Sequence, residues 1–296
     1  MRLAGIVIGT NSTRLLLAEV EGERVAAVKT DLITTRLGQG INGGSLLPEA
    51  MERTLLALEQ FLEQIHVFGA KGIITAATSA VRDAVNKEEF LQRVKQRTGL
   101  QVLVLSGMEE AAASYRGVLS GLSGCSESTL VLDVGGGSTE MIWPEKQGIQ
   151  YVSCPVGAVR MTEGGHSPGQ ITAMLADTLQ RIREQAAKDL SLVAVGGTAT
   201  SLAAMSLQLE QYQPELVHGS YLPLAEIERL YAVLAAAGPQ GRKKIKGLQP
   251  QRADIILAGV KIIEIVLQGL NLPGLRVSEA DILHGLVIKL ARSLSE

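Results

Sequence analysis

The sequence predicts an α/β protein with two similar halves, and three observations support this. Residues 129–143, TLVLDVGGGSTEMIW, have the pattern of a strand, a tight glycine turn and a second strand. The stretch IVIGTNSTRLLLAEV, which starts at Ile6, repeats that order at a constant offset of 126 residues. Strand-like apolar runs alternate with helical patterns along the rest of the chain. A duplicated hairpin suggests two halves that face each other across a cleft.

Composition limits the classes of function. With 296 residues the chain is long enough for two domains, and 46% hydrophobic residues suffice for a buried core. Only 3% of the residues are aromatic, which argues against a stacking platform for single-stranded nucleic acid. The formal net charge of −2 excludes bulk attraction to polyanions. We therefore expect no nucleic-acid partner, and any anionic substrate must meet a local patch.

Targeting and redox signals indicate a cytoplasmic protein. The two cysteines, Cys125 and Cys154, form no disulfide framework and are expected to be reduced. The apolar run at the start of the sequence is too short for a signal peptide, and no run is long enough to span a membrane. The four histidines lack metal-ligand spacing.

The first half of the chain reads as an alternation of strands and helices. Strands are expected at residues 3–8, 13–20, 24–30, 72–77 and 101–105, with a glycine-rich loop over residues 36–47. Pro48 opens a helix, and Thr78 or Ser79 caps a short helix that carries Arg82. Asn86 and Glu89 have the spacing of a capping box for the next helix.

Glu109 and Glu110 lie at the start of a helix that directly follows a strand. Acids in the first turn stabilise the helix dipole, which would be a purely structural role. The carboxyl ends of strands are also where open α/β sheets bind ligands, which would be a functional role.

The second half opens after a Gly/Ser-rich segment that begins at Gly121. Strands are expected over the hairpin, over residues 149–153, in SLVAV before Gly196, and in LRVSEA. Helices are expected over about residues 168–187, from Gly196 onward, near 223–236 and 251–269, and in ILHGLVIKLARSL at the end. We place the domains at residues 1–121 and 122–280, and consider that the last helix, about 281–296, packs back on the first domain.

Three glycine turns combine backbone N–H groups with hydroxyls, a pattern that suits anions. A β-hairpin with a glycine bulge needs no ligand and is the alternative for the first two turns. Close packing of a strand on a helix is the alternative for the third, which opens a helix. The turns consist of Gly9, Thr10, Asn11 and Ser12; of Gly135, Gly136, Gly137, Ser138 and Thr139; and of Gly196, Gly197 and Thr198.

Charged side chains flank two of these features. Asp133 and Glu140 lie on either side of the second turn, where acids could hold a cation or a water against a phosphate. The segment GRKKIKGLQPQR is the obvious cationic patch of a net-negative chain, although such runs are usually solvated surface. Its basic residues are Arg242, Lys243, Lys244, Lys246 and Arg252.

Taken in order, these motifs resemble the exopolyphosphatase and guanosine pentaphosphate phosphohydrolase (Ppx/GppA) family. The resemblance covers the whole chain and includes HG at His218 and RADIILAG at Arg252. The further matches are IGTNSTRLLL, ATSAVRDAVN, LSGMEEA, LVLDVGGGSTE and VGGTATSLAAM. It implies two ribonuclease H-like domains of the actin-like ATPase and sugar kinase superfold, with an interdomain cleft and without the additional C-terminal domains of longer members.

The resemblance also implies a mechanism. The substrate would be inorganic polyphosphate or guanosine pentaphosphate, an alarmone of the stringent response, and the choice stays open. Glu110, or else Glu109, would be the general base, and Arg82 would clamp phosphate oxygens. The first two glycine turns would cradle phosphates, and Asp133 with Glu140 would hold Mg²⁺. The basic patch would line a substrate channel, and the third turn would lie on the side of the site where a nucleotide binds. A homodimer is a further hypothesis.

One departure from the family pattern affects the metal site. The family has an acid two residues before the first glycine, where this chain has Val7. In the internal repeat Val7 aligns with Asp133, and a valine binds no cation. An alternative is therefore a weakly active or non-catalytic binder of polyphosphate or alarmone. A second alternative, suggested by Gly196, Gly197 and Thr198, is an ATPase or kinase of the same superfold.

Overall fold

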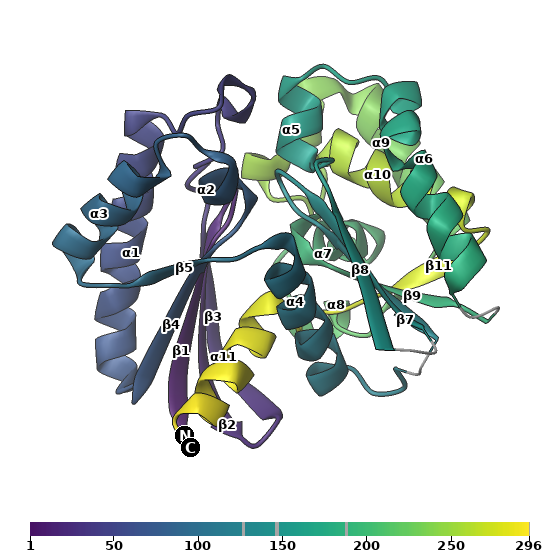
Figure 1. Ribbon diagram of the computed structural model, residues 1–296. Coiled ribbons are helices and arrows are strands. Elements are labelled where there is room, and N and C mark those ends of the chain that lie inside the picture. Colours follow the sequence, from purple (N-terminus) through teal and green to yellow (C-terminus); the bar gives the residue numbers. More distant parts are fainter. Residues whose placement is uncertain (126–127, 146–147, 187–188, 296) are drawn as a thin grey trace. The chain divides into compact units, whose positions relative to one another are not determined.

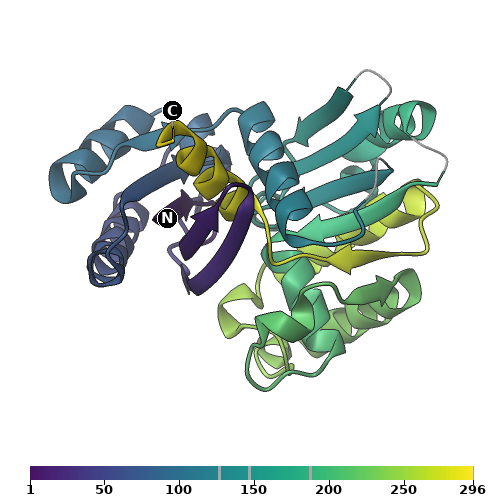
Figure 2. The same cartoon turned by 90° about the horizontal axis from the view of Figure 1, so that it is seen from below.

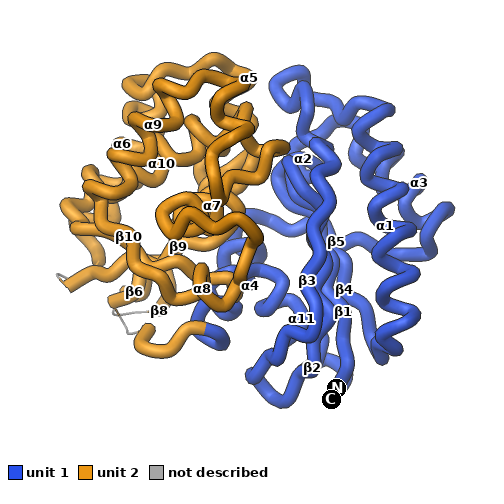
Figure 3. The backbone as a smooth tube through the Cα atoms, turned by 180° about the vertical axis from the view of Figure 1, so that it is seen from behind, with its two compact units in different colours: residues 1–121, 281–296 blue, residues 122–280 orange. Residues whose placement is uncertain are grey.

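The computed structural model describes residues 1–125, 128–145, 148–186 and 189–295. The chain forms two compact units, shown in different colours in Figure 3. Unit 1 comprises Met1–Gly121 and Asp281–Glu296, and unit 2 comprises Leu122–Ala280. Each unit contains one mixed β-sheet with helices packed on it, which is the α/β class that the sequence predicts. No helix in the described part of the chain is long and apolar enough to cross a membrane.

Unit 1 contains a five-stranded sheet in the order β3-β2-β1-β4-β5. The first three strands form an antiparallel meander, and β1, β4 and β5 are parallel. Its strands are β1 (Arg2–Ile8), β2 (Thr13–Glu21), β3 (Arg24–Ile33), β4 (Gly72–Ala77) and β5 (Val102–Val104). Its helices are η1 (Ile41–Gly43), α1 (Pro48–Phe68), α2 (Ser79–Asp83), α3 (Lys87–Thr98), α4 (Gly107–Gly121) and α11 (Ile282–Ser293).

The two faces of this sheet are covered by different helices. Ala4, Ile6 and Ile8 pack with apolar residues of α1 and α3 on one face. Leu3 and Val7, which alternate with them, pack on the other face with α11. Figure 1 shows α1 and α3 on one side of the sheet, with α4 and α11 on the opposite side. The alternation along β1 therefore decides that the side chain of residue 7 points toward the α11 side.

Unit 2 repeats this plan in a six-stranded sheet with the order β10-β11-β9-β6-β7-β8. Its strands are β6 (Thr129–Val134), β7 (Thr139–Glu145), β8 (Gly148–Cys154), β9 (Ser191–Val195), β10 (Tyr221–Pro223) and β11 (Gly274–Val277). Its helices are α5 (Ala158–Glu163), α6 (Pro168–Gln185), α7 (Gly196–Ser206), α8 (Pro214–Val217), α9 (Leu224–Arg242), η2 (Pro250–Arg252) and α10 (Ile256–Gly269). Figure 2 shows this sheet together with its helices from below.

The internal repeat is visible in the backbone geometry. The Gly9 N–H donates to the Ser12 carbonyl at 3.0 Å, and the Gly135 N–H donates to the Ser138 carbonyl at 2.9 Å. The strands then pair in equivalent register, with Ile8 opposite Thr13 and Val134 opposite Thr139. The two hairpins therefore have the same turn, not only similar residues.

One sequence-based expectation is wrong in detail. Asn86 precedes α3 but its side chain caps no helix N–H group. Instead its amide donates to the Leu46 carbonyl and accepts from the Leu46 N–H, which ties the preceding loop to this helix. The helix expected near residues 223–236 is present, and Gly238, which is not helical and has a φ of 61°, separates it from a second short helical segment that ends at Arg242. Glycine adopts this φ without strain, so the first helical segment ends there and the chain bends before the second begins.

Candidate active site

In unit 1 the predicted site residues follow the carboxyl ends of three parallel strands. The first turn, residues 9–12, follows β1, α2 follows β4, and α4 follows β5. Thr10, Asn11 and Ser12 are buried, and the Thr10 Oγ1 lies 3.0 Å from the Ser79 Oγ. Ser79 was not among the candidates, although it belongs to the short helix that carries Arg82. The hydroxyls of two separate segments are thus brought together at one edge of the sheet.

The loop after β3 supports the first turn from behind. The Arg36 N–H donates to the Asn11 carbonyl, and the Gly38 N–H donates to the Thr10 carbonyl, both at 2.8 Å. A Cβ at Gly38 would overlap the Thr10 side chain, so only glycine allows this approach. Two carbonyls of the turn are therefore fixed by the loop, which holds the turn in one conformation.

Arg82 and Glu110 form the charged centre of unit 1. The Arg82 Nη1 donates to the Glu110 Oε2 at 2.8 Å and to the Leu105 carbonyl at 3.0 Å. The Glu110 side chain is only 9% exposed and the Arg82 side chain 23%, so the carboxylate is shielded from water and the guanidinium is half-buried. The Arg82 Nε lies 3.6 Å from the Asp83 carboxylate. The pair joins the start of α4 to α2 and places a carboxylate and a guanidinium in direct contact.

Glu109 lies in a different environment from its neighbour. Its Oε2 accepts hydrogen bonds from the Ser106 N–H at 2.9 Å and from the Ser106 hydroxyl at 2.8 Å. These bonds, the backbone one foremost, lower the pKa of Glu109 from its ordinary value. Glu109 is exposed and caps the first turn of α4, which is the structural role that the sequence left open. The carboxylate in contact with Arg82 belongs to Glu110.

In unit 2 the second glycine turn is bound tightly by the segment that starts α5. The N–H groups of Ala158 and Val159 donate to the carbonyls of Gly135 and Gly136 at 2.9 and 2.8 Å. The Arg160 Nε donates to the Gly137 carbonyl at 2.8 Å. Arg160 was not among the predicted site residues. The only feature of the sequence that could have identified Arg160 is its place in the segment CPVGAVRMTE after β8. These contacts fix the conformation of all three glycines.

The two predicted metal ligands face each other across neighbouring strands. Asp133 on β6 is directly opposite Glu140 on β7, so both side chains lie on the same face of the sheet. Glu140 is fully buried and its Oε1 accepts from the Ser153 hydroxyl at 2.6 Å. Asp133 is 9% exposed and borders Gly196, where a Cβ would lie 2.8 Å from its Oδ1.

This donor set fits Mg²⁺ in chemistry. Among the described residues no three His, Cys, Asp or Glu side chains form a metal cluster of their own. Mg²⁺ prefers oxygen ligands and usually takes one or two carboxylates together with waters and substrate phosphates. The Asp133 and Glu140 pair supplies two such carboxylates on one face of the sheet.

Close packing surrounds the third glycine turn. Gly196 has a φ of 83° and begins α7 directly after β9. A Cβ at Gly197 would overlap the guanidinium of Arg252, which is itself buried. Thr198 is buried against Gly259, where a Cβ would lie 2.6 Å from the Thr198 Oγ1. Packing thus accounts for the small residues of this turn.

The structure separates the basic residues of the predicted channel. Arg242 is buried and its Nε donates to the Leu234 carbonyl at 2.7 Å, so it stabilises the kinked end of α9. Lys243, Lys244 and Lys246 are not buried, and the Lys246 Nζ lies 2.8 Å from the Glu210 carboxylate. Lys243 and Lys244 remain as a short exposed basic segment.

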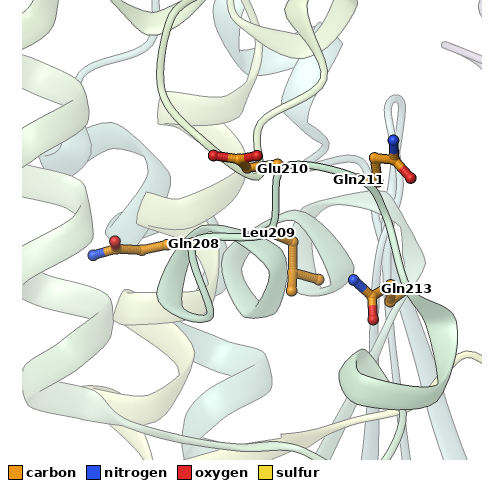
Figure 4. Close-up of a pocket in the computed structure, with 5 residues that line it drawn as sticks. All are labelled: Gln208, Leu209, Glu210, Gln211 and Gln213. Atoms are coloured by element: carbon orange, nitrogen blue, oxygen red, sulfur yellow. The ribbon is translucent and has the colours of Figure 1, made fainter.

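One pocket in unit 2 lies beside the basic segment and is not lined by the glycine turns or the predicted metal ligands. It has a volume of about 630 Å³ and is lined by the segment between α7 and α8 (Figure 4). Its lining residues are Gln208, Leu209, Glu210, Gln211 and Gln213, of which Glu210 pairs with Lys246 of the basic segment. Figure 4 shows Gln208 and Gln211 pointing in different directions, so the amides do not converge on a common ligand position.

Comparison with known proteins gives a consistent result. A sequence model described as the Ppx/GppA phosphatase family matches residues 16–294. "Exopolyphosphatase 2" of Mycobacterium tuberculosis is 32% identical, with 98% of each chain covered. A "Bifunctional 3-dehydroquinate synthase/phosphatase" of Fusobacterium nucleatum is 34% identical, with 97% of this chain covered, but this chain covers only 46% of that protein.

Solved structures agree with the sequence comparison. A Ppx/GppA family member from Aquifex aeolicus has a TM-score of 0.81 at 28% identity, with 100% of this chain and 99% of that chain covered. An exopolyphosphatase from Cytophaga hutchinsonii has a TM-score of 0.90 at 26% identity, with 99% and 98% covered. The predicted class, two α/β domains of the actin-like superfold, is thereby confirmed.

Proposed function

Because the chain belongs to the Ppx/GppA phosphatase family, we propose that it removes terminal phosphate from inorganic polyphosphate or guanosine pentaphosphate. The observation that carries this proposal is the pair of Arg82 and the buried Glu110 beside the turn at residues 9–12. A carboxylate that orients a water and a guanidinium that binds phosphate oxygens are the groups that phosphoanhydride hydrolysis needs.

Glu110 acts as the general base in this proposal. Its Oε2 is held by Arg82, so the carboxylate has a defined orientation before a substrate arrives. The carboxylate would accept a proton from the attacking water while the water adds to the terminal phosphorus. The Arg82 fork can neutralise charge on the phosphoryl oxygens as the bond to the leaving phosphate breaks. Glu109 is bound as a helix cap and supports Glu110 only through the position of α4.

Phosphate groups would bind at the glycine turns, and Asp133 with Glu140 would hold Mg²⁺. The first turn offers the hydroxyls of Thr10 and Ser12, with Ser79 beside it. The second turn has its carbonyls bound to α5 and Arg160, which sets its conformation. When bound, Mg²⁺ supplies charge neutralisation for phosphate oxygens. We further propose a cytoplasmic protein, and leave a homodimer as a hypothesis for native mass measurement.

The test is side-by-side turnover of long-chain polyphosphate and guanosine pentaphosphate with Mg²⁺. Release of phosphate by the wild type, and its loss in Glu110→Gln, is the expected result. The ratio of kcat/KM values decides which substrate is preferred. Failure to hydrolyse either substrate, or full activity in Glu110→Gln, would refute the proposal.

A second candidate, favoured by Val7, is a binder of polyphosphate or alarmone with little turnover. The buried valine takes the position where the repeated hairpin has Asp133. Tight binding of polyphosphate in calorimetry, combined with no phosphate release at saturating Mg²⁺, would support this candidate over the hydrolase.

A further inference from the structure

The two repeated hairpins differ at one pair of positions that face each other across the strands. In unit 2 this pair is Asp133 and Glu140, and in unit 1 the equivalent pair is Val7 and Arg14. Both turns close with the same backbone hydrogen bond, so the comparison is residue by residue. An acid pair in one hairpin thus corresponds to an apolar residue and a cation in the other.

Arg14 is bound by an acid from the far end of the chain. Its Nη1 donates to the Oδ2 of Asp281, the residue that precedes α11. The Asp281 Oδ1 accepts from the Leu283 N–H at 3.0 Å and thereby caps α11. Both carboxylate oxygens of Asp281 are therefore engaged, and its side chain is only 6% exposed. A carboxylate bound in this way is poorly placed to become a cation ligand.

We propose that the ion pair of Arg14 and Asp281 replaces, in the first hairpin, the cation-binding acid pair of the second. This proposal rests on the proposed function for the presence of a divalent cation. The cation is then bound by carboxylates of unit 2 alone, and the first hairpin holds a guanidinium where the second has an acid. An acid at position 7 would pair with Arg14 and would add no metal ligand.

The local environment of Val7 supports this assignment. Val7 is 2% exposed and packs in the same apolar cluster as Ile282 and Leu283. A carboxylate at this position would lie directly across the strand from Arg14, within the distance at which opposite charges pair. A guanidinium beside a carboxylate competes with a cation for the same oxygens and repels it.

Binding of Mn²⁺, measured by electron paramagnetic resonance without substrate, tests whether unit 2 alone supplies the ligands of the cation. We expect the wild type to bind one Mn²⁺ per chain. The affinity for Mn²⁺ should stay within about threefold of wild type in Val7→Asp and in Asp281→Asn. Asp133→Asn should bind Mn²⁺ at least about tenfold more weakly. A gain of about tenfold or a second Mn²⁺ in Val7→Asp would overturn the proposal. So would a similar loss in Asp281→Asn, because Asp281 would then be a ligand. Absence of any Mn²⁺ from the wild type would overturn the cation site whether or not the enzyme turns over.

Thermal unfolding tests the ion pair independently of any metal or activity. Asparagine still caps a helix, so Asp281→Asn removes the charge and keeps the cap. We expect it to lower the unfolding midpoint by about 5 °C, because the ion pair between Arg14 and Asp281 is lost. Adding Val7→Asp in that background should restore part of the loss, whereas Val7→Asp alone should destabilise. Purely additive losses in the double variant would show that the introduced carboxylate does not pair with Arg14 and would overturn the proposal.

Discussion

Arg82 and Glu110 lie 28 residues apart in sequence and share a hydrogen bond of 2.8 Å between Nη1 and Oε2. This contact joins the short helix after β4 to the helix after β5. It also distinguishes the two neighbouring acids of the segment LSGMEEA, because Glu109 bonds to Ser106 instead.

Substitution of the two acids should have opposite consequences. We expect Glu110→Gln to lower kcat by at least about 100-fold, because the amide cannot accept the proton of the attacking water. Glu109→Gln should keep kcat within about threefold and lower stability only slightly, because glutamine can still accept the Ser106 N–H bond and only the charge at the helix N-terminus is lost. Phosphate release and urea unfolding measure both effects. A greater loss of kcat in Glu109→Gln would reverse the assignment.

Arg82→Lys should lower kcat/KM by about tenfold or more while the chain stays folded. Lysine keeps the charge but has no planar fork, so it cannot bind Glu110, the Leu105 carbonyl and a phosphate oxygen together. Arg93→Lys is a suitable control, since Arg93 pairs with Glu52 on the helical side of unit 1. Unchanged kcat/KM in Arg82→Lys would show that charge alone is sufficient.

The Glu109 cap predicts a dependence of stability on acid pH. The hydrogen bonds from Ser106 hold the pKa of Glu109 below its ordinary value, so the folded state favours the ionised form. This stabilisation is present above the unfolded pKa of about 4.3 and is lost as the pH falls through the lower, folded value. Ser106→Ala removes the hydroxyl bond and keeps the Ser106 N–H bond, so it should lower the urea midpoint at neutral pH, and part of this loss should disappear below about pH 4.

The control for this pH dependence is Ser120→Ala. The Ser120 hydroxyl donates to the neutral Gly117 carbonyl, so the stability difference should not depend on acid pH. A Ser106→Ala difference that stays constant down to about pH 3 would show that Glu109 ionisation contributes nothing.

The exposed basic segment should affect long substrates more than short ones. We expect the double variant Lys243→Gln with Lys244→Gln to weaken binding of long-chain polyphosphate and to flatten its salt dependence, because fewer counterions are released. Short phosphate chains should bind as before. Lys246→Gln should have a smaller effect, since Glu210 already pairs with Lys246. Equal losses for both chain lengths would contradict a channel role.

Removal of the metal should abolish turnover, and the acid pair should set the Mg²⁺ requirement. Chelation with EDTA should stop phosphate release, and added Mg²⁺ should restore it. Asp133→Asn should need at least about tenfold more Mg²⁺ for half-maximal rate, because one of the two charged oxygen ligands becomes neutral. An unchanged Mg²⁺ requirement would place the metal elsewhere.

The sequence by itself determined the repeated hairpins and the segments where site residues gather. Strand propensity, glycine at the turn and the side-chain period of two are local properties, so they can be read without tertiary contacts. The repeat of Gly9 and Ser12 at Gly135 and Ser138 predicted two similar turns, and both close with the same hydrogen bond. The candidate acids after β5 followed from the rule that ligands bind at carboxyl ends of strands, and Asp133 and Glu140 from their places on either side of the second turn.

Only the tertiary structure decided which partner each polar side chain has. Asn86 matched a capping box but bonds to Leu46, and Arg242 matched a surface patch but is buried against α9. Arg14 meets Asp281 across 267 residues of sequence, a pairing that no local pattern encodes. The physical reason is that a hydrogen bond or ion pair depends on which distant segments pack together. Short-range propensity fixes the elements, and non-local packing assigns their side chains.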